Sequence, residues 1–146
     1  MKKRIITCQR GFTLIEIMVV VVILSILAGI VMPRLLDEPE KARRTKAQTQ
    51  IRSLEESLGM YKLNSGFYPS TEQTLEALVH KPESGRIPKN YKEGGYISKI
   101  PLDPWGNPYI YLCPGTHGDY DLLSYGADGE PGGEDKDADI ANYNME

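Results

Sequence analysis

The sequence has few of the residues and none of the motifs on which most enzyme active sites depend. Its 146 residues include only two cysteines, Cys8 and Cys113, and two histidines. Cys8 and Cys113 do not form a Cys-x-x-Cys pair, and their positions do not suggest a disulfide bridge. A glycine-rich phosphate loop, a Gly-x-Ser-x-Gly elbow and a His-Glu-x-x-His motif are all missing. We therefore predict that the protein is not an enzyme.

A signal-peptidase site is also missing after the long apolar run. Residues 12–32 contain a single charged side chain, Glu16, and about 20 apolar residues are enough to cross a bilayer core. Residues 1–10 carry four basic side chains and no acidic one, which favours a cytoplasmic location for that flank. A secretory signal peptide begins in the same way, but small residues follow its apolar region. Because residues 33–37 read Pro-Arg-Leu-Leu-Asp, we predict that the apolar segment is retained.

Placing the charged Glu16 side chain in an apolar segment costs free energy. A carboxylate at the membrane centre costs roughly 2.5–3.5 kcal/mol, and the cost is smaller near one end. One interpretation is that Glu16 reaches the headgroups and has no further role. The alternative is that its charge is matched by a partner.

The motif Gly11-Phe12-Thr13-Leu14-Ile15-Glu16 resembles the class III signal of type IV pilins and of the pseudopilins of type II secretion. Residues 102–109 and 126–129 resemble the major pseudopilins in particular. The resemblance implies that a prepilin peptidase cuts between Gly11 and Phe12 and methylates the new amine of Phe12. Glu16 would then pair with the Phe12 amine of a neighbouring subunit during assembly.

This resemblance also implies a domain organisation and a function. Residues 1–11 would be a leader, residues 12–33 a transmembrane and assembly helix, and residues 34–146 a periplasmic globular domain. The protein would be the structural subunit of a pseudopilus, a homopolymer that helps to export folded proteins across the outer membrane. Its partners would be further copies, minor pseudopilins, the prepilin peptidase, the inner-membrane assembly platform and the membrane itself.

Downstream of the apolar run, the pattern predicts an α+β fold that is pilin-like. Apolar residues between Ala47 and Tyr61 recur at spacings of 4 and 3, which is typical of one buried helical stripe, and glycine at position 66 predicts the helix end near 64–66. The long helix would pack on a small antiparallel sheet made of a hairpin at 109–112 and 120–124, with a third strand near 138–143. We also expect a short helix over 71–80, capped by Ser70 or Thr71, and a buried Trp105.

Acidic residues dominate the C-terminal end. Residues 119–146 contain nine acidic side chains and one basic one, so this part carries a charge of −8 and the remainder +5. This distribution argues against nucleic-acid binding at that end and is typical of a cation site or a solvated loop. Glycines and hard oxygen donors together suit Ca²⁺, although the spacing is not that of an EF-hand.

The family resemblance favours one Ca²⁺ in this loop over a merely solvated segment. By position, the implied ligands are Asp128, Asp135, Asp139 and the carbonyl of Tyr125, with Glu130, Glu134 and Asp137 as further candidates.

Three other functions stay open from the sequence. A type IV pilin for adhesion or motility is the nearest one, but a single globular cysteine cannot form the C-terminal disulfide that many pilins carry. A membrane-anchored calcium-binding module that never polymerises is another. A secreted enzyme with a cleaved signal peptide is the third.

Overall fold

The computed structural model describes residues 11–145, apart from the side chains of residues 31–38 and 136. The leader predicted at 1–11 lies almost entirely outside the described residues. The chain divides into two compact units, one ending at Glu38 and the other beginning at Pro39. Helix α1, Leu14–Ser65, contributes its first part to one unit and its second part to the other.

In the first unit, the apolar part of α1 is exposed to solvent. All residues from 11 to 30 are exposed, and Leu14 retains 80% of its accessible surface. Within the described part of the chain, none of the helices combines the length and the hydropathy that a membrane crossing requires. The span predicted over residues 12–33 stays a prediction, and the side chains of 31–33 are not described.

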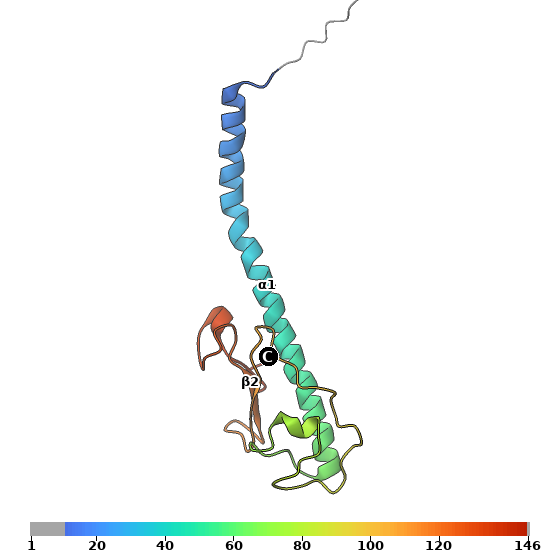
Figure 1. Ribbon diagram of the computed structural model, residues 1–146. Helices are drawn as coiled ribbons and strands as arrows, with labels where there is room; N and C mark the ends of the chain where they lie inside the picture. Colours follow the sequence, from blue (N-terminus) through green and yellow to red (C-terminus); the bar gives the residue numbers. More distant parts are fainter. Residues whose placement is uncertain (1–10, 146) are drawn as a thin grey trace, which may run out of the picture. The chain divides into compact units, whose positions relative to one another are not determined.

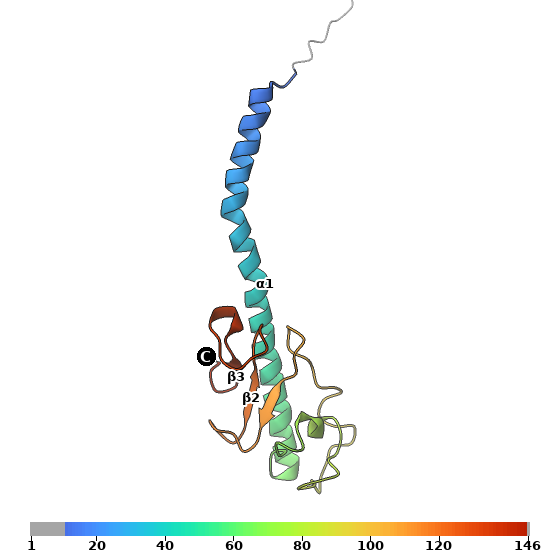
Figure 2. The same cartoon turned by 60° about the vertical axis from the view of Figure 1, so that its left-hand side comes forward.

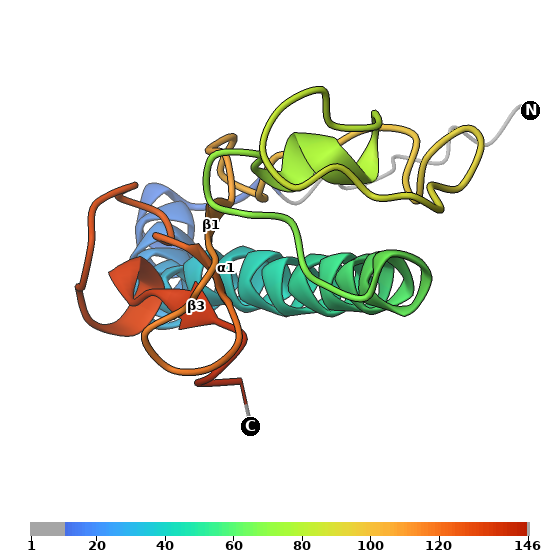
Figure 3. The ribbon, with the colours of Figure 1, turned by 90° about the horizontal axis from the view of Figure 1, so that it is seen from below.

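The second unit is an α+β domain, as predicted. Its three short strands, β1 (Ile110–Leu112), β2 (Asp121–Ser124) and β3 (Ile140–Ala141), form one antiparallel sheet in that order. The sheet lies beside the second part of α1, and the loops between residues 67 and 109 lie beside the same part of the helix (Figures 1, 2 and 3). The predicted hairpin and third strand are confirmed.

Periodicity located the helical part of the core correctly. The predicted stripe of α1 is buried throughout, with no residue more than 2% exposed. It packs with Leu122 from β2 and Ile140 from β3, because the faces of the helix and the sheet each leave an apolar surface that only the other can cover. The helix ends at Ser65, and Gly66 follows it with φ of 81°. The buried stripe residues are Ala47, Ile51, Leu54, Leu58 and Tyr61.

The short helix predicted over 71–80 is smaller than expected. Only the 3-10 helix η1, Leu75–Leu78, forms there. Ser70 and Gln73 exchange hydrogen bonds in a capping-box pattern before this helix, but the N-cap of η1 is Thr74, whose side chain accepts from the Glu76 amide, and not the predicted Ser70 or Thr71. Thr74 has φ of 53°, a left-handed conformation that interrupts an α-helix before it can extend.

Trp105 is less buried than predicted. Its ring is partly buried against the core and not fully enclosed. The indole N–H donates to Oε1 of Glu40 at 2.7 Å. Because an indole N–H needs an acceptor, the ring edge lies where α1 supplies a carboxylate, and this position keeps part of the ring at the surface.

Candidate functional sites

The first candidate site is the start of α1. The Glu16 amide donates to Oγ1 of Thr13 at 3.3 Å, and Oε2 of Glu16 accepts from the Thr13 amide at 3.4 Å. This reciprocal pair is a capping box, which satisfies two backbone donors at a helix N-terminus. Phe12 precedes it and is 78% exposed. Pairing of Glu16 with an amine of another molecule, and cleavage after Gly11, stay predictions.

The second candidate site is the acidic loop, defined here as residues 125–139. It leaves the end of β2 and returns to the start of β3, and it contains the 3-10 helix η2, Asp135–Asp137. Two glycines let it fold back on itself. A Cβ on Gly126 would lie 3.0 Å from the Asp137 carbonyl oxygen, and one on Gly133 only 2.5 Å from it. Side chains at these two positions would force the backbone strands of the loop apart.

Asp139 is the predicted ligand whose carboxylate is most clearly prepared for a cation. Its Oδ2 accepts a hydrogen bond from the Gly132 amide at 2.9 Å. Its Oδ1 is shielded from solvent and has no hydrogen-bond partner among the described residues. A buried carboxylate oxygen without a partner is costly, and either a cation or a donor would remove that cost. Asn144 fixes the backbone here, because its Nδ2 donates to the Asp139 carbonyl at 3.2 Å.

The other predicted ligands are open to solvent. Oδ1 of Asp128 accepts from the Glu130 amide at 3.1 Å, and Asp135 is exposed with φ of 53°. Tyr125 is partly exposed. Within the described residues, no three Asp, Glu, His or Cys side chains gather into a group able to hold a metal. The structure therefore brings the predicted ligands into one loop without bringing their carboxylates together.

Asp103 anchors the base of this loop, and the sequence prediction missed it. Its Oδ2 accepts from the Ser124 hydroxyl at 2.6 Å, and its Oδ1 accepts from the amides of Trp105 and Asn107 at 3.0 and 2.7 Å. The Ser124 hydroxyl oxygen in turn accepts from the Gly126 amide at 3.2 Å. Aspartate is favoured at the start of turns because its side chain can accept a hydrogen bond from the backbone amide two residues later. The sequence therefore contained a signal for the turn that Asp103 forms.

Arg44 anchors the other end, and no local signature predicts its contact. Its Nη1 donates to the Ala138 carbonyl at 2.9 Å, although the two residues are 94 positions apart. Arg44 belongs to a basic cluster in the sequence, Lys41 to Lys46, and a cluster of this kind is usually a solvated helical face. The structure shows instead that one member of the cluster points to the acidic loop and is partly buried.

A third cluster lies at the opposite end of β2. Asp121 is buried and accepts hydrogen bonds from the amides of Thr116 and His117 and from Nδ1 of His117. The His117 ring stacks on Tyr143 with ring centroids 3.7 Å apart. Burial alone would raise the pKa of the Asp121 carboxyl, but these hydrogen bonds outweigh it and lower the pKa below its ordinary value.

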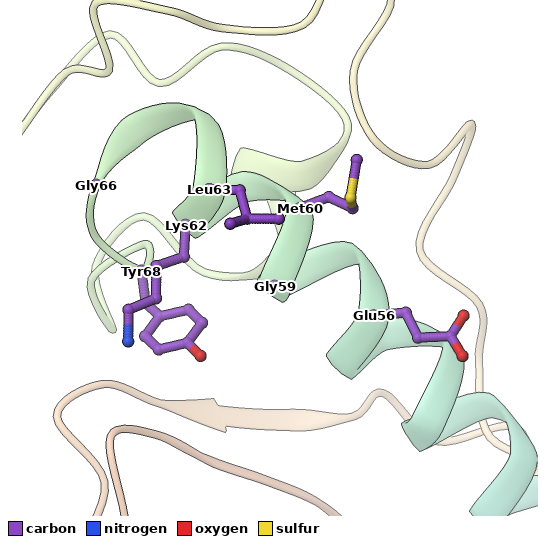
Figure 4. Close-up of a pocket in the computed structure, with 7 residues that line it drawn as sticks. All are labelled: Glu56, Gly59, Met60, Lys62, Leu63, Gly66 and Tyr68. Carbon is purple, nitrogen blue, oxygen red and sulfur yellow. The ribbon is translucent and has the colours of Figure 1, made fainter.

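A groove also opens at the C-terminal end of α1 (Figure 4). Its volume is about 830 Å³, and its lining is mainly apolar. Met60 and Leu63 are exposed there, and Nζ of Lys62 lies 4.4 Å from the centre of the Tyr68 ring. None of the ligands predicted from the sequence lines this groove.

Comparison with known protein families identifies the family of this chain. Residues 34–143 match the model described as type II secretion system (T2SS), protein G, and residues 6–32 match the prokaryotic N-terminal methylation motif. The chain belongs to the type II secretion protein G family. The family resemblance expected from Gly11–Glu16 and from the downstream motifs is confirmed.

Relatives in this family are similar over nearly their whole length. The type II secretion system core protein G of Pseudomonas aeruginosa is 57% identical over 135 residues, which cover 92% of this chain and 95% of the relative. That of Vibrio cholerae is 56% identical over 138 residues, covering 94% of each. The crystal structure of the major pseudopilin from the type 2 secretion system of enterohaemorrhagic Escherichia coli matches with a TM-score of 0.69 and 43% identity, over 77% of this chain and 96% of that one.

Family membership supports the predicted function class and fold class. The protein G chains are structural subunits of the type II secretion pseudopilus, and the matching crystal structure is that of a major pseudopilin. No catalytic family is among these matches. The methylation-motif match, residues 6–32, includes Gly11 to Glu16, where the processing residues are expected.

Proposed function

We propose that this chain is made as a membrane-anchored precursor and polymerised, after processing, into a periplasmic pseudopilus. A prepilin peptidase would cut between Gly11 and Phe12 and methylate the Phe12 amine, leaving a helix that begins at the mature N-terminus. The basic residues before the cut favour a cytoplasmic location for that flank, and the globular unit would then be periplasmic. The methylation-motif match and the type II secretion family membership support this proposal.

The exposed apolar part of α1 is the observation that carries the assembly proposal. The large apolar side chains between Leu14 and Ile30 are about half exposed or more, far beyond what a soluble monomer usually leaves uncovered. Such a segment needs a bilayer before assembly and other copies of itself afterwards. The partners would be further copies of the chain, minor pseudopilins and the inner-membrane platform that drives assembly.

Glu16 would change its partner during this process. In the subunit, its carboxylate contacts the Thr13 amide at the N-terminus of its own helix. Next to another processed subunit, the same carboxylate would neutralise the cationic Phe12 amine of its neighbour. Both charges are costly in hydrocarbon, so pairing them favours assembly in register.

The role proposed here is structural and not catalytic. The T2SS protein G family contains structural subunits, and the exported substrates would be moved by the growing fibre while other proteins supply the chemical energy. The single globular cysteine, Cys113, is free, which is compatible with a pseudopilin and not with a disulfide-closed pilin loop.

Calcium binding by the acidic loop is the second part of the proposal. Ca²⁺ takes six to eight oxygen ligands and tolerates irregular geometry, which suits this glycine-rich loop. Asp128, Asp135 and Asp139 would hold the ion together with the Tyr125 carbonyl. The partnerless Oδ1 of Asp139 supports the fit, because it needs a positive group that the described residues do not supply. Like charges repel, so bound Ca²⁺ would draw these carboxylates together and fix the loop.

The mass of the mature N-terminus is the most direct test of the assembly proposal. Protein purified from cells that contain the peptidase should begin at Phe12 and carry one added methyl group. A Gly11→Leu variant serves as the unprocessed control and should keep residues 1–11. Fibres built from chains that retain these residues, or a mature chain that lacks the apolar helix, would refute the proposal.

A further inference from the structure

Both ends of the acidic loop are connected to one short stretch of α1, from Glu40 to Arg44. At the β2 end, Gly126 bonds to Ser124 and Ser124 to Asp103. Asp103 also accepts from the Trp105 amide, and the Trp105 indole donates to Glu40 at 2.7 Å. At the β3 end, Arg44 donates directly to the Ala138 carbonyl. Glu40 and Arg44 are four residues apart on the helix, so they lie on one face.

We propose that Arg44 is a positioning residue for the calcium ion of the acidic loop, and that it communicates cation binding to α1. The inference rests on the proposed calcium function and goes beyond it, because it assigns a role to a residue that would not touch the ion. Arg44 holds the Ala138 carbonyl, and Asp139 is the next residue. With Gly132 occupying Oδ2 of Asp139, the solvent-shielded Oδ1 is held in one position and is left without a partner among the described residues.

Fixing this end of the loop reduces the conformational entropy that the loop loses when a cation binds. A loop with fewer conformations needs less ordering when its oxygens converge on an ion. Contacts that hold a metal ligand in place without touching the ion commonly change metal affinity by about 10–100-fold when they are removed. The Arg44 contact is well suited to the task because it is partly buried and charge-assisted, and it joins the loop to a helix whose position the core already fixes.

The charge of Arg44 makes this proposal distinguishable from a simple electrostatic effect. A guanidinium beside a cation site repels the cation, so loss of the positive charge alone would strengthen calcium binding. Loss of the positioning contact would weaken it. The two explanations therefore predict opposite signs for the same substitution.

The experiment is a calcium titration of the full-length processed protein in detergent, by calorimetry. Arg44→Ala should raise the calcium Kd by about tenfold or more, whereas Arg44→Lys should recover most of the affinity because it keeps a charged donor for the Ala138 carbonyl. Arg52→Ala is the matched control: Arg52 is exposed on the same helix, and its removal should leave the Kd unchanged. Melting without calcium verifies that each variant is folded, and Arg44→Gln replaces Arg44→Ala if the latter is not.

A second readout follows the communication to α1. Trp105 is the only tryptophan of the chain and contacts Glu40, so its fluorescence reports on this turn of the helix. Calcium should change that fluorescence in the wild type and in Arg52→Ala, and the change at saturating calcium should be smaller in Arg44→Ala.

Each result has a clear meaning. Equal or tighter calcium binding by a folded Arg44→Ala or Arg44→Gln variant would overturn the positioning role and leave the calcium proposal intact. An unchanged Trp105 signal in calcium-saturated wild type would overturn the communication to α1. Failure of the wild type itself to bind calcium would remove both the calcium proposal and this inference.

Discussion

Asp103 accepts a hydrogen bond from the Ser124 hydroxyl at 2.6 Å, and both side chains are buried. Asp103 also receives two backbone amides, so a single carboxylate organises the turn at 103–107 and the end of β2. Carboxylates that accept several hydrogen bonds tolerate burial because each bond is charge-assisted. The hydrogen bond between Ser124 and Asp103 joins the turn at 103–107 to β2, the strand that leads into the acidic loop.

Removal of the Asp103 carboxylate should therefore destabilise the second unit. We expect Asp103→Ala to lower the free energy of unfolding by about 2–4 kcal/mol, because it leaves the Trp105 and Asn107 amides and the Ser124 hydroxyl without their acceptor. Ser57→Ala is a suitable control, since the Ser57 hydroxyl bonds only to the carbonyl one helical turn before it. Urea denaturation measures both, and equal stability of the two variants would contradict the assigned role of Asp103.

Two leucines of α1 provide a matched test of the core. Leu58 is completely buried, whereas Leu63, five positions later, is 80% exposed. Leu58→Ala should cost about 2–5 kcal/mol of unfolding free energy, because it removes buried surface and leaves a cavity. Leu63→Ala should change stability by less than about 0.5 kcal/mol in the unassembled subunit. A similar loss from both variants would show that the helical stripe is assigned to the wrong face.

The lowered pKa of Asp121 predicts a dependence of stability on pH. Since the folded-state pKa lies below the unfolded one, the carboxylate stabilises the fold at pH values above its unfolded pKa. That contribution is lost as the pH falls through the folded-state pKa. Asp121→Asn should flatten this acid limb of the curve of unfolding free energy against pH. Denaturation at a series of pH values between neutral and strongly acidic would show it, and an unchanged acid limb would exclude Asp121 as its source.

Calcium removal should lower the thermal stability of the wild-type protein. Binding stabilises the folded state by mass action, by about 2.7 kcal/mol at a calcium concentration of 100 times the Kd. A chelator should therefore lower the Tm, and Asp139→Asn should abolish most of the calcium-dependent shift. Glu93→Gln, at an exposed position outside the acidic loop, should keep the full shift. A melt that is insensitive to calcium and chelator would remove calcium from the proposed function.

Glu16 should be required for assembly and not for processing. Glu16→Ala should still yield a chain that begins at methylated Phe12, but cross-linking between subunits and fibre formation should fall steeply. The reason is that the Phe12 amine would then be left without its counter-charge in an apolar surrounding. Mass spectrometry of the mature chain and electron microscopy of sheared fibres measure the two steps separately. Normal fibres from the variant would exclude the pairing.

The sequence alone determined the features that depend on local order and periodicity. The stripe from Ala47 to Tyr61, the helix end before Gly66 and the hairpin at 110–124 follow from repeating burial and from turn residues, and the structure confirms them. The family also follows from contiguous motifs, Gly11 to Glu16 and the downstream stretches 102–109 and 126–129, because each is recognised from neighbouring residues in the chain.

Only the tertiary structure decided which polar groups meet. Arg44 and Ala138 are 94 positions apart, and Trp105 and Glu40 are 65 apart, so no pattern in the sequence links either pair. These contacts depend on packing of the apolar stripe on the sheet, which sets where the helix lies and so which polar groups lie close enough to pair. Periodicity predicts which face of α1 is buried. The partner of each polar side chain depends on the path of the strands and loops that pack against that face.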